Sequence, residues 1–293
     1  MSIQGRDIIL TGAKGVVGKP LHKAMLDQGY DVLPMSRKAS DRYIRWDMSR
    51  SPLPDEYNPR FMINCAPIWC LVGQIEHLAQ RGLKRLIAFS STSVLTKRQS
   101  KTEAERQVTK KILAAETELM SVCKAYNVDL TLIRPTMIYG LGQDQSIFKM
   151  AKFINEWGFT VVGGSGAGLR QPVHTLDLVE ACLKFIQNPN SYNKIYNLAG
   201  PKPMTNRDMM ALIAKAVGKA SPIISIPIPI LRLGLSALNF RSKFRYTPEM
   251  ADRMMQDLSF DITPAVVDFG YDPQPFLADP IRDLPGLTNK ARA

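Results

Sequence analysis

The stretch RDIILTGAKGVVG, residues 6–18, decides the fold. It begins with a short apolar run, RDIIL, typical of a buried strand. The pattern T-G-x-x-G-x-x-G follows, and its glycines let the backbone turn tightly and approach a pyrophosphate. A helix that begins there would direct free N–H groups at that anion. The residues expected to hold the diphosphate are Thr11, Gly12, Gly15, Val16, Val17 and Gly18.

Further apolar runs of strand length follow this unit and alternate with helical patterns. They lie at residues 30–35, 43–47, 61–66, 84–91, 128–135 and 195–200. Such alternation predicts an α/β fold, a Rossmann-type doubly wound parallel sheet with helices on both faces. We expect residues 1–140 to form this domain, with 170–200 returning to it. Residues 141–169 and 201–293 would form a smaller C-terminal α/β lobe.

The composition restricts the classes of function. The chain has 293 residues, of which 45% are hydrophobic and 22% charged, as in a globular protein. Its net charge of +12 favours an anionic partner such as a phosphorylated substrate or cofactor, and no nucleic-acid-binding motif accompanies it. The four cysteines lack metal-ligand spacing, so we expect no metal. No apolar run could span a membrane and no signal peptide is evident, which predicts a cytoplasmic protein.

The loop after the second predicted strand indicates which dinucleotide binds. An acidic residue there would hold the ribose hydroxyls, but the sequence PMSRKAS supplies Ser36, Arg37 and Lys38 instead. A guanidinium can pair bidentately with a 2′-phosphate. The loop therefore favours NADP(H), with NAD(H) as the alternative, unless it is only a solvated basic loop.

Several fragments, taken in order, resemble the extended short-chain dehydrogenase/reductase family, in its nucleotide-sugar epimerase, dehydratase and ketoreductase branch. The resemblance covers about residues 6–275. It implies that WDMS contacts the adenine, that NCAP follows the cofactor, and that LIRPTMIYG lies beside the nicotinamide. The cofactor-binding residues that it implies are Asp47, Met48, Cys65, Ala66, Pro67, Pro135 and Thr136.

The same resemblance implies where a substrate would bind and react. FSSTSV matches the end of the fifth strand, where Ser91 would be catalytic and Thr92 is the neighbouring alternative. GLRQPVHTLDLVEA matches the segment in which Arg170 would bind a substrate diphosphate. Tyr139 offers a phenol as a proton donor, although the surrounding IYG is equally typical of a structural turn. His174 stands alone before a helix, and such a histidine is more often structural.

The family's catalytic Tyr-x-x-x-Lys pair is absent. Counting back from LIRP with the family's spacing places Val108 and Ile112 at those two positions. Glu116 then matches a glutamate that the family commonly carries one turn later. The helix is predicted independently by a capping box at residues 102–105 and by an apolar stripe, so both aliphatic residues are expected to pack. The stripe comprises Val108, Ile112, Ala115, Leu119, Val122 and Tyr126.

Two functional hypotheses follow. The favoured one is an atypical NADP(H)-dependent epimerase, dehydratase or reductase that acts on a nucleotide-linked sugar in surface-glycan metabolism. The other is a noncatalytic NADP(H)-binding assembly, accessory or redox-sensing protein, similar to the nucleotide-binding accessory subunit of respiratory complex I. The missing tyrosine and lysine favour the second hypothesis, and Arg170 favours the first.

One further segment bears on the partners. Residues 221–246 are apolar and basic, which is typical of a lobe helix over a substrate cleft. The alternative is a peripheral contact with an anionic membrane, which would place the protein at the inner face of that membrane. A homodimer also stays open.

Overall fold

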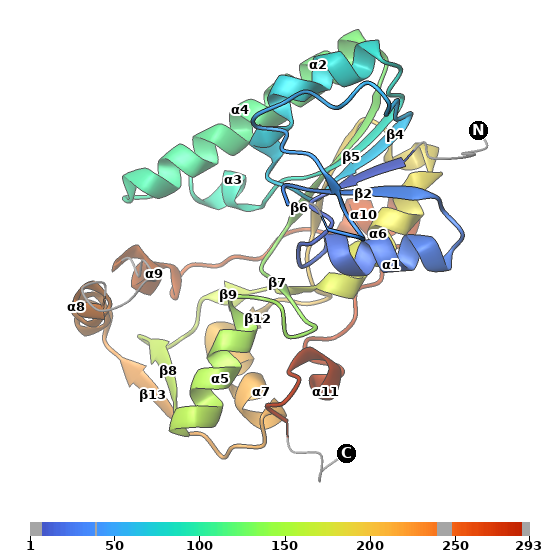
Figure 1. Ribbon diagram of the computed structural model, residues 1–293. Coiled ribbons are helices and arrows are strands. Elements are labelled where there is room, and N and C mark those ends of the chain that lie inside the picture. The colour runs from blue at the N-terminus through green and yellow to red at the C-terminus, as the bar shows by residue number, and fades with distance from the viewer. Residues whose placement is uncertain (1–7, 39, 239–247, 289–293) are drawn as a thin grey trace.

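The computed structural model describes residues 8–38, 40–238 and 248–288, and its centre is a seven-stranded sheet (Figure 1). Every neighbouring pair of strands in it is parallel. The strand order is β11 (Lys194–Leu198), β6 (Asp129–Pro135), β5 (Arg85–Phe89), β4 (Phe61–Asn64), β1 (Ile8–Thr11), β2 (Val32–Ser36) and β3 (Ile44–Arg45). The predicted fold class, a Rossmann-type parallel α/β sheet, is confirmed.

Helices cover both faces of this sheet (Figure 1). One face carries α1 (Gly18–Asp27), α6 (Thr175–Ile186), α10 (Thr263–Phe269) and the short η2 (Pro189–Ser191). The other carries η1 (Ile68–Cys70), α2 (Val72–Gln80) and α4 (Glu103–Ala125), with α3 (Ser93–Thr96) beside the start of α4. Successive side chains of a strand point to opposite faces, so Ile8 and Leu10 join the core under α1 and α6, while Ile9 joins the core under α2 and α4.

The order of the strands places a crevice at one point of the sheet. β1 has β2 on one side and β4 on the other, so the chain order reverses there. In open parallel sheets, ligands bind outside the carboxyl ends of the strands at such a reversal. The predicted glycine turn follows β1 directly and lies at this edge.

The C-terminal lobe has a core of its own, formed by Ile147, Ile154, Met209, Ile213 and their neighbours. Its helices are α5 (Ile147–Trp157), α7 (Asn206–Ala216), α8 (Ile228–Leu238), α9 (Pro248–Arg253) and α11 (Pro280–Asp283). Its strands are β7 (Ile138–Tyr139), β8 (Thr160–Gly163), β9 (Leu169–Arg170), β10 (Val173–His174), β12 (Met204–Thr205) and β13 (Ile223–Ile226), which form two-stranded pairs. Thr205 caps α7 as expected, because its hydroxyl accepts the Asp208 N–H at 3.0 Å.

Two features of the C-terminal third differ from the expectation. Residues 263–271 do not belong to the lobe, since Ala265 and Tyr271 are buried in the core beneath α1 and α6. The basic, apolar segment divides into β13 and α8, and its residues 239–246 lie outside the described residues. No helix in the described part of the chain is long and apolar enough to cross a membrane.

The predicted apolar stripe of α4 is wrong at its start. Val108 is 47% exposed, and burial begins with Thr109 and Ile112. The first turns of α4 reach past the edge of the sheet, so no strand lies beneath them (Figure 1). The capping box is also wrong: Thr102 is at the N-cap position, but its hydroxyl caps no N–H. The Glu105 carboxylate instead accepts hydrogen bonds from Lys97, Ser100 and Arg253.

Candidate functional site

The turn between β1 and α1 requires glycine at positions 12 and 18. Gly12 has a φ of +67°, and a Cβ there would lie 2.6 Å from the backbone of Cys65 and Ala66 at the end of β4. A Cβ on Gly18 would lie 2.2 Å from the Gly12 carbonyl oxygen. The Gly15 N–H donates to that same oxygen at 2.8 Å. The turn is therefore pressed against β4 and leaves the start of α1 facing the crevice.

A cavity of about 740 Å³ occupies the crevice at the carboxyl ends of β1, β2 and β4. It gathers most of the residues predicted to bind the cofactor: Thr11, Gly12, Gly15, Ser36, Arg37, Lys38, Asp47, Met48, Cys65, Ala66 and Pro67. Val16 and Val17 lie in the turn and Gly18 begins α1, and none of the three lines the cavity. Pro135 and Thr136 also lie outside its lining, and the Thr136 hydroxyl donates to the Gln171 carbonyl at 2.5 Å.

The cavity is cationic on the side of β2 and β3. Its cations are Lys14, Arg37, Lys38, Arg45 and Arg50. Asp47 is the only carboxylate among the described residues that line it. The Ser49 hydroxyl donates to Asp47 at 2.6 Å and, with the nearby arginines, holds the pKa of this carboxyl below its ordinary value. The site therefore presents positive charge without a carboxylate at the end of β2, where ribose hydroxyls would be held.

The loop after β2 is folded by its own contacts. The Ser36 hydroxyl donates to the Lys38 carbonyl at 3.0 Å and accepts the Lys38 N–H at 3.2 Å. The Lys14 ammonium donates to the same carbonyl at 2.9 Å, which ties the glycine turn to this loop. The Arg37 guanidinium and the Lys38 ammonium have no hydrogen-bond partner among the described residues, so both cations are free to meet an anion.

The two cysteines of the cavity are not activated thiols. Cys65 closes the end of β4, where burial raises the pKa of its thiol far above the ordinary value. Burial also raises the pKa of Cys70, and the charge of Asp47 adds to that effect. Because the thiolate is the nucleophilic form, neither residue is suited to covalent chemistry at neutral pH.

Glu116 is buried in α4 and holds the helix to the sheet. Its carboxylate receives the Arg134 guanidinium of β6 at 2.5 and 2.8 Å and the Ser90 hydroxyl at 2.5 Å. Ile112, one turn earlier, is buried in the core, whereas Val108 faces solvent. The helix therefore uses its buried Glu116 carboxylate for packing. It has no ionisable side chain at positions 108 and 112, where the resemblance implies a tyrosine and a lysine.

The hydroxyls of Ser91 and Thr92 differ in burial and in their hydrogen bonds. The Ser91 oxygen accepts the Ser93 N–H at 3.1 Å, its side chain is half-buried, and its own proton remains free to be donated. The Thr92 hydroxyl is buried and donates to the Pro135 carbonyl at 3.0 Å. Thr92 therefore closes the junction of β5 and β6, and Ser91 is the hydroxyl still able to meet a ligand.

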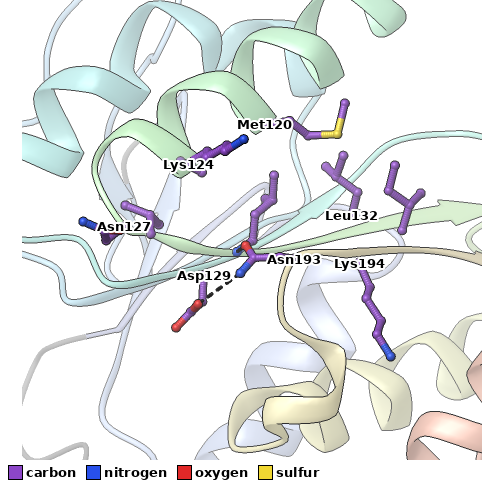
Figure 2. Close-up of a pocket in the computed structure, with 11 residues that line it drawn as sticks. Met120, Lys124, Asn127, Asp129, Leu132, Asn193 and Lys194 are labelled. Atoms are coloured by element: carbon purple, nitrogen blue, oxygen red, sulfur yellow. Dashed lines mark hydrogen bonds between the residues drawn. The ribbon is translucent and has the colours of Figure 1, made fainter.

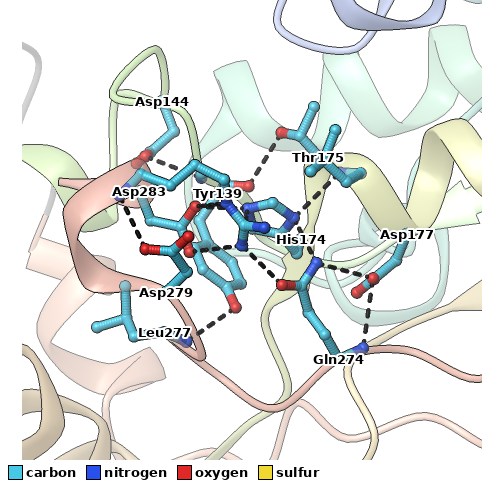
Figure 3. Close-up of polar contacts among 12 residues, drawn as sticks. Tyr139, Asp144, His174, Thr175, Asp177, Gln274, Leu277, Asp279 and Asp283 are labelled. Atoms are coloured by element: carbon cyan, nitrogen blue, oxygen red, sulfur yellow. Dashed lines mark hydrogen bonds and ion pairs between the residues drawn. The ribbon is translucent and has the colours of Figure 1, made fainter. Parts of the chain in front are cut away.

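Tyr139 is part of the lobe core and is not placed as a proton donor. Its hydroxyl accepts the Leu277 N–H at 3.0 Å, and its ring packs edge-on against His174 and Phe276 (Figure 3). Burial raises the pKa of this phenol well above its ordinary value. The hypothesis of Tyr139 as a catalytic acid is therefore corrected, because the phenol is enclosed by protein and is 1% exposed.

His174 belongs to a buried polar network that the sequence did not reveal (Figure 3). Its Nδ1 accepts the Leu176 N–H at 3.1 Å, so Nε2 carries the proton and donates to Asp283 at 2.8 Å. Arg282 donates to the same carboxylate and to the side chain of Gln274. These contacts pin the C-terminal segment onto the start of α6, and His174 is structural, as expected.

Arg170 does not face a ligand site. Its guanidinium donates to the carbonyls of Leu169, Gln256 and Arg253, at 2.6, 2.8 and 2.5 Å. The Arg253 carbonyl ends α9 and the Gln256 carbonyl follows it, so Arg170 fixes the end of that helix. The prediction that Arg170 binds a diphosphate is corrected, because the residue is 7% exposed and three of its five N–H donors are occupied by backbone oxygens.

A second cleft adjoins the start of α4. It has a volume of about 470 Å³, and Lys97, Ser100, Glu105 and Arg253 lie in its wall. The Glu105 carboxylate forms ion pairs with Lys97 at 3.1 Å and with Arg253 at 2.5 Å. The pair with Arg253 joins the sheet domain to the lobe. Sequence reasoning missed this cluster because Arg253 lies in no recognisable motif. Glu105 was noticed only as a capping residue.

A third cavity, of about 450 Å³, lies away from these sites (Figure 2). It is lined by Met120 and Lys124 of α4 and by residues at the starts of β6 and β11. The starts of these strands are the opposite edge of the sheet from the cavity that follows β1. None of the predicted site residues lines it. The described residues also contain no group of three or more His, Cys, Asp or Glu able to hold a metal ion.

Comparisons with known proteins agree with this geometry. Residues 74–199 match the NAD dependent epimerase/dehydratase family. The UDP-glucose 4-epimerase of Vibrio cholerae is 23% identical over 54% of this chain and 46% of its own length. The 40 kDa subunit of NADH-ubiquinone oxidoreductase from Neurospora crassa is 24% identical over 56% of the chain and 46% of its own length. The matched region thus spans about half the length of these curated relatives.

The same fold occurs in a solved nucleotide-sugar enzyme. The UDP-glucuronic acid 4-epimerase of Bacillus cereus, in complex with UDP-glucuronic acid and NAD, superposes with a TM-score of 0.70. The superposition covers 94% of this chain and 97% of that one, at 16% identity. This likeness shows the fold.

Proposed function

We propose that this chain, which carries a domain of the NAD dependent epimerase/dehydratase family at residues 74–199, binds NADP(H) in the cavity beside the glycine turn. One observation carries the proposal. The loop after β2 presents Arg37 and Lys38 to the cavity, with no carboxylate at the end of the strand. A 2′-phosphate would complete this arrangement, because it accepts hydrogen bonds from two cations that make none with the described residues.

The other parts of the dinucleotide have residues suited to them. Backbone N–H groups at the start of α1 would hold the diphosphate. Asp47 and Met48 line the cavity next to the cationic loop and would enclose the adenine. The bound nicotinamide would supply hydride chemistry to any reacting group within its reach. Ser91 has the free hydroxyl that could orient such a group.

The geometry favours binding without the family's usual proton transfer. Val108 and Ile112 occupy the tyrosine and lysine positions, and the phenol of Tyr139 is enclosed. This supports a noncatalytic accessory or redox-sensing role, and the similarity to a complex I subunit agrees with it. Such a protein would report the state of the cofactor pool through its NADP(H) occupancy.

A nucleotide-sugar oxidoreductase of surface-glycan metabolism is the second candidate. The similarity to UDP-glucose 4-epimerase and the free hydroxyl of Ser91 favour it. Arg253, in place of Arg170, would then be a candidate cation for a substrate diphosphate, since its side chain lies in the wall of the second cleft. Incubation of the NADPH- and NADP⁺-loaded protein with UDP-glucose and UDP-glucuronic acid separates the candidates. A new sugar nucleotide among the products, or a change in nicotinamide absorbance, supports the oxidoreductase, and the absence of both supports the accessory role.

Fluorescence titration with NADPH and NADH tests the cofactor proposal. We expect the double substitution Arg37→Ala/Lys38→Ala to weaken NADPH binding at least about tenfold and to change NADH binding little, because only NADPH carries the phosphate. Arg42→Ala is the matched control, since Arg42 is an exposed cation of the same region that does not line the cavity. An equal loss for both dinucleotides would contradict the role of the loop.

A further inference from the structure

A further cavity adjoins the dinucleotide cavity beyond the end of β3. Its volume is about 570 Å³. The two cavities share lining residues, among them Met48, Arg50 and Cys70. The further cavity is also lined by Trp69 of η1 and Gly73 of α2, and we call it the Trp69 cavity. A ligand that contacts Met48 and Cys70 therefore lies at the boundary of both cavities.

The loop after β2 determines where the adenine of the proposed dinucleotide would lie. The 2′-phosphate and the adenine are attached to neighbouring carbons of one ribose, so the base lies close to the phosphate that Arg37 and Lys38 would hold. The diphosphate leads from this ribose back to the glycine turn after β1, and β3 lies on the far side of β2 from β1, so the base is directed toward the end of β3. Met48 follows β3 and lines both cavities, so the base would lie where they meet.

Trp69 offers an aromatic face at this boundary. Its neighbours Ile68 and Leu71 are buried, whereas Trp69 itself is 41% exposed. Its ring makes no aromatic contact, and its N–H no hydrogen bond, among the described residues. The ring is therefore available to stack on a planar group in the cavity.

The space beside Trp69 is kept open by a glycine. Gly73 lies about one turn of helix after Trp69, in the first turn of α2. A Cβ on Gly73 would meet no atom within 4 Å, and the backbone there is not left-handed. Glycine is unfavourable in a helix, and neither its φ nor a close neighbour requires it here. The missing side chain therefore leaves room in the Trp69 cavity.

We propose that the adenine ring of the bound dinucleotide stacks on the Trp69 indole. The inference rests on the proposed binding of a nicotinamide dinucleotide beside the glycine turn, and it adds the residue that would hold the base. Stacking on an aromatic side chain uses the π-face of the base and needs no phosphate. NADPH and NADH carry the same adenine, so Trp69 would strengthen the binding of both, whereas Arg37 and Lys38 would act on NADPH alone.

Isothermal titration calorimetry with NADPH, NADH and ADP-ribose tests the stacking. ADP-ribose carries the adenine and the diphosphate but has no nicotinamide. We expect Trp69→Ala to weaken the binding of all three ligands at least about fivefold and to leave the ratio of the NADPH and NADH affinities unchanged. Trp69→Phe should restore most of the loss, because phenylalanine also offers an aromatic face. Trp157→Ala is the matched control: Trp157 is 61% exposed in the lobe, lines neither cavity and should not affect binding.

A second variant blocks the cavity and keeps the indole. Gly73→Leu would place a branched side chain in the space beside Trp69, and the helical backbone accepts it. We expect this variant to weaken the binding of all three ligands at least about fivefold, because the base loses its place against the ring. Gly73→Ala adds a single methyl group and should have a smaller effect. Circular dichroism checks that the fold of each variant is intact.

The stacking and the proposed function fail in different ways. If the wild-type protein binds NADPH and Trp69→Ala binds the three ligands equally well, the stacking is overturned and the dinucleotide site stands. A loss confined to NADPH would place Trp69 at the 2′-phosphate and would also overturn the stacking. A wild-type protein that binds neither NADPH nor NADH would overturn the proposed function, and the stacking with it.

Discussion

The dinucleotide cavity and the region around α4 share one edge of the sheet but use their polar groups differently. In the cavity, the side chains of Arg37 and Lys38 lack hydrogen-bond partners among the described residues, and the glycine turn leaves N–H groups facing the crevice. Around α4 and the lobe, the polar groups serve packing: Glu116 is paired, Thr92 donates to a carbonyl, and Arg170 is held by three carbonyls. The comparison teaches that the cavity leaves polar groups available to a ligand, whereas the polar groups around α4 and Arg170 are used in packing.

The substitution Gly12→Ala should disrupt the cavity beside the glycine turn and have the largest effect of the substitutions considered. The new Cβ would meet the backbone of β4 at 2.6 Å, and the φ of +67° disfavours any side chain. We expect NADPH affinity to fall at least about 100-fold, because the turn must move away from β4. Gly29→Ala is the control, since Gly29 has a similar φ of +81° but no atom near its Cβ position. Titration should show unchanged NADPH binding for this control.

The substitution Glu116→Ala should reveal the structural role of α4. It would leave the Arg134 guanidinium, whose side chain is 15% exposed, without its carboxylate, and such a loss costs about 3 kcal/mol of unfolding free energy. Urea denaturation measures this cost. Glu118→Ala, on the exposed side of the same helix, should change stability by less than about 0.5 kcal/mol. Equal effects at the two positions would mean that Glu116 does not hold α4 to the sheet.

The contact between Glu105 and Arg253 should show a characteristic pH dependence. Burial raises the pKa of Glu105, but the Ser100 hydrogen bond and the charges of Lys97 and Arg253 outweigh it, so the net pKa is lowered. A lowered folded-state pKa stabilises the fold above the ordinary glutamate value of about 4.3, and this contribution is lost as pH falls through the folded-state pKa. Glu105→Gln should therefore cost about 1.5–3 kcal/mol at pH 7 and progressively less under acid conditions. A variant with the same deficit at every pH would contradict this assignment.

The smallest effect is expected at Val108. Its side chain is 47% exposed, so Val108→Tyr should change the unfolding free energy by less than about 0.5 kcal/mol. Ile112→Ala provides the contrast, because this residue is buried and its truncation should cost about 2–5 kcal/mol. Equal losses of stability in the two variants, measured by thermal denaturation, would mean that the difference in burial between Val108 and Ile112 does not determine their contributions to stability.

Local patterns were sufficient to predict the sheet and the glycine turn. The strands are apolar runs, and a sheet covered by helices on both faces buries them. The turn needs glycine because the backbone of Cys65 and Ala66, just after β4, leaves no room for a Cβ at Gly12. The apolar stripe of α4 was misplaced by one turn, since the sequence does not say where the sheet beneath a helix ends.

The roles of Arg170 and Tyr139 could not be predicted, because distant segments decide them. Arg170 donates to a carbonyl 86 residues away along the chain, and Tyr139 accepts an N–H 138 residues away. Every residue has a backbone carbonyl, so the sequence does not indicate which carbonyls will accept hydrogen bonds from a given arginine. A motif can therefore place Arg170 correctly without revealing that its guanidinium donates to backbone carbonyls. The same holds for Glu105, whose partner Arg253 lies 148 residues away.

The most direct test of the central claim compares the two dinucleotides on the unmodified protein. Fluorescence titration of the purified chain with NADPH and with NADH, under identical salt conditions, measures both affinities. The cationic loop after β2 predicts that NADPH binds at least about tenfold more tightly than NADH. Equal affinities, or tighter binding of NADH, would contradict the assignment of this cavity to NADP(H).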